Sequence, residues 1–167
     1  MRNLEDIYNS ACDNHTECYQ YLIHEKRACS LMGEKALSDL FSEYHQHMKI
    51  PMNGNYFNNI LLMLNQLNAI AASMEEQSGS AEYWFRHAFE LRSRAEKIAS
   101  DVLRYSDGNC PQFACSVAEI RVTCALLAYN LNNDTEAVRY AVSALNLPAW
   151  ESVAETAKSI IEYAKRK

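Results

Sequence analysis

Side chains that could bind a metal ion gather between residues 39 and 47. Asp39, Glu43 and His47 follow one another at steps of four residues, so a helix would place all three on one face. Di-iron helical bundles, however, pair Glu-x-x-His motifs from two helices, and this sequence contains no such motif. The apolar residues of the segment recur on a different face. We therefore expect a solvated polar face here, and no bound metal or other cofactor.

The histidines supply no paired acid and base for catalysis. His15 follows Leu4, Tyr8 and Ala11 at helical spacing, which is typical of a core or rim histidine, and no nucleophile can be assigned to it. The sequence has no G-x-S-x-G, no Gly-rich phosphate loop and no H-E-x-x-H motif. We therefore expect no enzymatic activity.

The six cysteines do not form a zinc or redox motif. None belongs to a C-x-x-C pair, and most fall inside helical patterns, where a reduced cysteine packs as a small hydrophobic residue. Cys110 differs because it precedes Pro111 at the expected start of a helix, where backbone N–H groups can stabilise a thiolate. An unreactive residue next to a helix cap is the simpler interpretation of Cys110.

The charge balance argues against nucleic-acid and membrane partners. Sixteen Lys and Arg against 21 Asp and Glu give a formal net charge of -5, and the only basic run is Lys165–Lys167 at the end of the sequence. The densest apolar run, Ile60 to Leu64, is far too short to span a membrane. The first residues contain no apolar stretch typical of a secretory signal. We expect a cytoplasmic protein.

The positions of the few glycines and prolines divide the chain into helices. Only four Gly and three Pro occur in 167 residues, mostly between segments with apolar residues at helical spacing, and no alternating strand pattern is present. The sequence predicts seven helices, at 3–31, 34–49, 54–76, 80–106, 111–131, 134–146 and 149–166. Asp13 and Asn14 could divide the first of them. Short connections favour antiparallel neighbours, so residues 1–167 form one all-α domain.

Segments 80–106 and 149–166 each have a charged outer face. In the last segment Trp150, Val153 and Ile160 are expected to face inward, and the one-sided pattern predicts a capping helix that covers a core. Asp134 is the predicted N-cap of the segment that precedes it.

Segments 54–76 and 111–131 are nearly free of charge. The first has no charged residue before Glu75, and the second has only two. One face of the first collects amides around Leu62: Asn55, Asn58, Asn59, Asn65 and Gln66. The second carries Glu119 and Arg121, a second apolar strip that includes Val122 and Tyr129, and a flank of alanines that would let another helix approach closely. Helices without a charged face are contacted on both sides.

Residues 132–148 resemble the turn and second helix of a tetratricopeptide repeat. Ala137 and Ala144 stand where that family has its two small residues, Ala141 replaces the larger apolar residue between them, and Pro148 ends the unit. Ala81, Phe85, Ala88 and Leu91 repeat the same steps earlier, although Ala81 and Ala137 are 56 residues apart, more than the family's usual period of about 34. The resemblance implies an irregular superhelix of antiparallel pairs, in which first helices line a concave surface. An irregular helical bundle is the alternative.

These observations predict a module that binds a peptide or helix of another protein in a groove lined by the third and fifth segments. The expected contact residues are Asn55, Asn58, Asn59, Leu62, Asn65, Gln66, Glu119, Arg121, Val122 and Tyr129. The alternative for the amide face is internal packing against neighbouring helices. Two other functions fit the sequence: a small acidic inhibitor or immunity-type protein that masks a basic surface, and a ligand-binding sensor. An uncharged helix could equally serve a homodimer.

Overall fold

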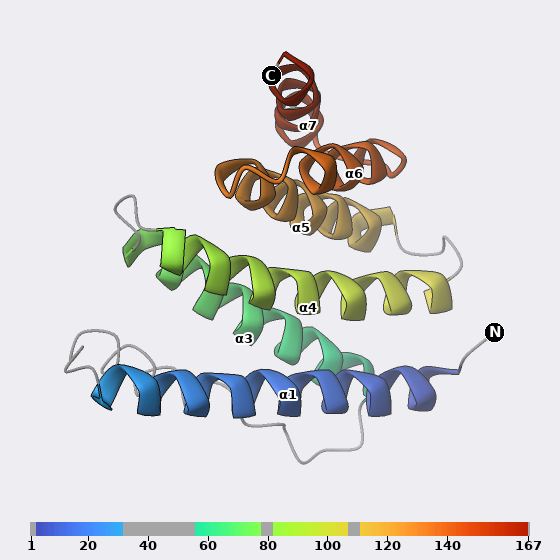
Figure 1. Ribbon diagram of the computed structural model, residues 1–167. Helices are drawn as coiled ribbons and strands as arrows, with labels where there is room; N and C mark the ends of the chain where they lie inside the picture. The colour runs from blue at the N-terminus through green and yellow to red at the C-terminus, as the bar shows by residue number, and fades with distance from the viewer. Residues whose placement is uncertain (1–2, 32–55, 78–81, 107–110, 167) are drawn as a thin grey trace.

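A computed structural model describes residues 3–31, 56–77, 82–106 and 111–166 of the chain, and these residues are all-helical, with no strand among them. The helices are α1 (Leu4–Leu31), α3 (Tyr56–Gln77), α4 (Glu82–Ser106), α5 (Pro111–Asn130), α6 (Asp134–Leu145) and α7 (Glu151–Lys165). They are stacked in chain order, from α1 at one end to α7 at the other (Figure 1). The all-α prediction is confirmed.

Several sequence predictions lie outside the described residues. The helix expected at 34–49, with Asp39, Glu43 and His47, lies there, as do Asn55 and Cys110. The first segment is one continuous helix through Asp13 and Asn14, because the Asn14 amide donates to the carbonyl of Ser10, 3.0 Å away, rather than ending the helix.

The start of α6 differs from the prediction. The N-cap is Asn133, whose side chain accepts a hydrogen bond from the backbone N–H of Glu136, 3.3 Å away, so Asp134 is the first helical residue. Asn132 has a φ of 60°, a left-handed conformation that Asn tolerates better than most residues. The consecutive asparagines therefore make the tight turn between α5 and α6, and Asp134 instead places a negative charge in the first turn.

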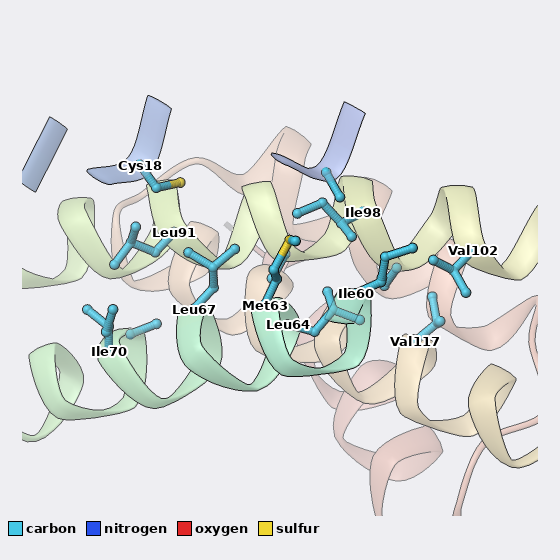
Figure 2. Packing of buried hydrophobic residues seen from close by; sticks show 14 of the residues in the cluster. Cys18, Ile60, Met63, Leu64, Leu67, Ile70, Leu91, Ile98, Val102 and Val117 are labelled. Atoms are coloured by element: carbon cyan, nitrogen blue, oxygen red, sulfur yellow. The ribbon is translucent and has the colours of Figure 1, made fainter. Parts of the chain in front are cut away.

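The larger core cluster lies along the contact between α3 and α4. The buried side chains of α3 recur at steps of three and four, so they form a single face, and Figure 2 shows Met63 and Leu67 directed at α4, which supplies Leu91 and Ile98. α1 contributes Cys18 and α5 contributes Val117 to the same cluster (Figure 2). Burying one such large side chain stabilises the fold by roughly 1.5–3 kcal/mol. The uncharged composition of α3 is thus explained in part by this core.

A seam of alanines joins α5 to α6. Ala118, Ala125 and Ala128 of α5 and Ala137, Ala141 and Ala144 of α6 are all at most 1% exposed and belong to one cluster. Side chains this small let two helix backbones approach closely. Ala157 and Ile160 of α7 pack on the same cluster, so α7 covers it.

Trp150 does not face inward as predicted. It is the N-cap of α7 in an extended conformation (φ −62°, ψ 148°), and 49% of it is exposed. The prediction assumed that Trp150 shares a helical face with Val153 and Ile160. That spacing does not apply to Trp150, because it precedes the first helical turn. Among the described residues, no helix is both long and apolar enough to cross a membrane.

Candidate binding groove

A hollow of about 390 Å³ lies between α3 and α5, and we call it the α3–α5 groove. Its walls are one face of each helix, and Arg92 of α4 lies between them. The lining residues are Leu61, Leu64, Asn65, Asn68, Arg92, Phe113, Ser116, Glu119, Ile120 and Thr123. The volume falls within the range of about 300–1,000 Å³ that is usual for ligand sites.

The amide-rich face of α3 is divided between the surface and the interior. Asn58, Leu62 and Asn65, spaced four and three residues apart, are exposed, Leu62 by 42%. Asn59 is fully buried and Gln66 is half-buried, one residue further along each turn. A shift of one residue rotates a side chain by about 100°, which is enough to move it from solvent to a neighbouring helix.

The inner amides bind α1. His15 Nε2 donates to Gln66 Oε1 at 3.0 Å, and the side chain of Asn59 forms a hydrogen bond with Tyr8. The amide face is therefore divided: the stripe with Asn59 and Gln66 packs internally, and the stripe with Asn58 and Asn65 is exposed. Only the exposed stripe continues into the α3–α5 groove, through Asn65.

The predicted contact residues of α5 do not lie together. Glu119 is exposed on the groove wall, whereas Val122 is 6% exposed and belongs to the cluster of α5, α6 and α7. Arg121 Nε donates to Glu96 of α4 at 3.1 Å, outside the groove lining, and Tyr129 is half-buried against the same cluster as Val122. Arg121, Val122 and Tyr129 therefore do not line the groove. The tertiary neighbours α4 and α6 lie on their side of α5, which the α5 sequence alone does not reveal.

A partly buried ion pair between Arg92 and Glu75 lies at the groove, and the sequence pattern did not predict it. Arg92 Nε and Nη2 donate to the two carboxylate oxygens of Glu75, at 2.5 and 3.0 Å, and Nη1 donates to Asn68 Oδ1 at 3.4 Å. The Arg92 side chain is only 10% exposed. In the sequence, the one indication that Arg92 is buried is its position next to Leu91, at the edge of the apolar stripe of α4. Because Glu75 compensates its charge, Arg92 adds little net charge to the groove.

Burial favours the neutral forms of several titratable groups in the described interior. Burial raises the pKa of the Cys18 thiol to about 12, and it raises the pKa of Cys124 as well, so both stay protonated and unreactive at neutral pH. Burial also lowers the pKa of His15 and His87, which keeps these two side chains neutral. Among the described residues, no group of three or more His, Cys, Asp or Glu side chains could hold a metal ion.

Comparison with known protein families, with curated proteins and with solved structures finds no significant match for this chain.

Proposed function

We propose that the chain is a non-catalytic interaction module in the cytoplasm, and that its α3–α5 groove binds a segment of a partner protein. The composition of the groove lining carries this proposal. Apolar residues such as Leu64, Phe113 and Ile120 line it together with amides and hydroxyls; its charged members are Glu119 and Arg92, and Glu75 compensates the charge of Arg92. Centres of protein interfaces are likewise depleted of charge and combine apolar anchors with hydrogen-bonding groups.

An extended segment suits these polar groups better than a helix. Thr123 Oγ1 donates to the carbonyl of Ile120 at 2.7 Å, and its oxygen can still accept a hydrogen bond. The amides of Asn65 and Asn68 can both donate and accept. A helix has already paired its backbone groups internally, whereas an extended chain presents them to such side chains. Glu119 favours a segment in which a basic residue lies beside the apolar anchor.

We further infer that the helices form tetratricopeptide-like pairs. α3 packs along α4 and α5 along α6, while α7 contacts both α5 and α6. The first helices of these pairs, α3 and α5, are the two that line the groove, as in a concave surface of that family. This order of packing supports a superhelix over an irregular bundle.

The two amide stripes provide a matched test of the binding proposal. Affinity capture from the native host, with quantitative mass spectrometry, identifies candidate partners. Peptides of these partners are then titrated against two variants. Asn58→Ala/Asn65→Ala changes the exposed stripe, and Asn59→Ala/Gln66→Ala changes the inner one. We expect the exposed pair to weaken binding by roughly 5- to 150-fold, since two hydrogen bonds contribute about 1–3 kcal/mol, with little change in Tm. The inner pair should lower Tm while the folded fraction still binds.

Equal capture by the wild type and the Asn58→Ala/Asn65→Ala protein, at equal stability, would refute the groove as the binding site.

Salt dependence separates the acidic-inhibitor function from binding in the groove. Association by net charge alone weakens steeply between 0.05 and 0.5 M NaCl, roughly as the Debye length shrinks, whereas association through apolar anchors and amides changes little. A partner lost in high salt and retained by the variant would favour the inhibitor.

A further inference from the structure

A second hollow, of about 510 Å³, shares no lining residue with the α3–α5 groove. It is bounded by α1, α4, α5 and α6, and its charged lining consists of Lys97, Arg104, Arg121 and Arg139 with Glu96 and Asp101. Four cations stand against these two carboxylates and Glu136, which is paired with Arg139, so the region has a local excess of one positive charge in a chain whose formal net charge is -5. We call this region the cationic hollow.

The inner wall of the cationic hollow is preorganised. The guanidinium of Arg121 donates to Glu96 Oε1 at 3.1 Å, to the Ser143 carbonyl at 3.1 Å and to Ser100 Oγ at 3.0 Å. Ser100 Oγ in turn donates to Glu96 Oε1 at 2.7 Å, so one buried network joins α4, α5 and α6. These bonds use three of the five N–H groups of Arg121, and the others remain able to donate to a ligand.

The outer cations are held loosely or in one orientation. Arg104 is 79% exposed, and its contact with Asp101 is long, at 3.5 Å. Lys97, one turn before Asp101, is exposed as well. Arg139 Nε and Nη2 donate to Glu136 Oε2, at 2.9 and 2.6 Å, and the guanidinium lies over the Tyr140 ring, 4.2 Å from its centroid. Flexible and fixed cations therefore converge on one hollow from two sides.

We propose that the cationic hollow binds the phosphate group of a phosphate monoester. A monoester carries a charge of about −1.5 to −2 at neutral pH, and the lining presents four cations to it against Glu96 and Asp101, with Glu136 beside Arg139 as a third carboxylate. Planar guanidinium groups suit phosphate oxygens because they donate two parallel hydrogen bonds. The volume exceeds what one phosphate needs, so the hollow also admits part of the group that carries it.

Calorimetric titration at fixed ionic strength tests this site directly. The probes are inorganic phosphate, glucose 6-phosphate and a phosphoserine peptide; the last two distinguish a small molecule from a modified protein as the source of the phosphate. The test variant is Lys97→Ala/Arg104→Ala, and the control is Lys158→Ala/Lys165→Ala on the exposed face of α7, which changes the net charge by the same amount.

We expect saturable binding of at least one probe, weakened tenfold or more in the test variant and unchanged in the control. Both variants alter exposed side chains, so both should fold, and their Tm values verify this. Absence of saturable binding to all three probes would overturn the proposal. Equal weakening in both variants would also overturn it, because it would show attraction by overall charge rather than by the hollow.

Discussion

His15 and His87 are buried histidines at contacts between helices. His15 is 1% exposed and bonded to Gln66, and His87 is 7% exposed with its ring 5.3 Å from the ring of Tyr21. Burial lowers both pKa values from the ordinary 6.5, since the low-dielectric interior disfavours the charged imidazolium. A bonded, neutral His15 therefore links α1 to α3, and it is suited to packing rather than to proton transfer.

Neutral burial of these histidines makes stability depend on pH. Below about pH 6.5 the unfolded chain binds protons that the folded chain excludes, so the free energy of unfolding should be nearly constant between about pH 7 and 8 and fall as the pH drops below this range. Urea denaturation at pH 7.5 and 5.5 measures the difference. In a His15→Gln/His87→Gln protein this difference should shrink, and an undiminished difference would show that other groups cause it.

At the scale of elements, α5 and α6 are joined by close backbone approach rather than by large side chains. The alanines of the seam leave no room for extra methylene groups, and Val142, next to Ala141 in sequence, is 43% exposed. The two positions differ in environment although they are adjacent, because a helix turns by about 100° per residue.

Ala141→Leu should destabilise the protein by about 1–3 kcal/mol, because the larger side chain forces α5 and α6 apart. Val142→Leu, which adds volume on the exposed side of the same helix, should change stability by less than about 0.5 kcal/mol. Chemical denaturation of the two variants checks this. Similar losses in both would mean that the seam is not tightly packed.

At the scale of the whole molecule, two core clusters share side chains. Phe89, Ile120 and Leu147 each pack against both the cluster of α1, α3, α4 and α5 and the cluster of α5, α6 and α7. Phe89 also contacts Tyr140 edge-on, with ring centroids 6.1 Å apart. Shared contacts of this kind couple the unfolding of the two ends of the stack.

Leu67→Ala tests that coupling. Leu67 is fully buried in the first cluster, so its truncation should lower the free energy of unfolding by roughly 2–5 kcal/mol. If the stack unfolds as one unit, hydrogen exchange in the seam of α5 and α6 should accelerate as much as in α3. Wild-type protection of the seam in this variant would instead show that α5–α7 fold independently.

The sequence alone determined where the helices lie and which of them lack charge. Apolar spacing, turn residues and caps are local properties, so the predicted bounds of α3, α5 and α7 differ from the observed ones by no more than two residues. The alanine flank of α5 was likewise readable, because small residues at helical spacing predict a close neighbour whatever that neighbour is.

The tertiary structure alone decided which polar side chains are exposed and which are buried. Asn58 and Asn59 are equivalent in a composition count, yet one is exposed and the other is fully buried against the interior. Glu119 reaches the α3–α5 groove, while Arg121 joins a network with α4 and α6 two residues later. Whether such a side chain is exposed or buried depends on which helices lie beside its face of the helix. Local periodicity does not predict this, because those helices come from segments distant along the chain.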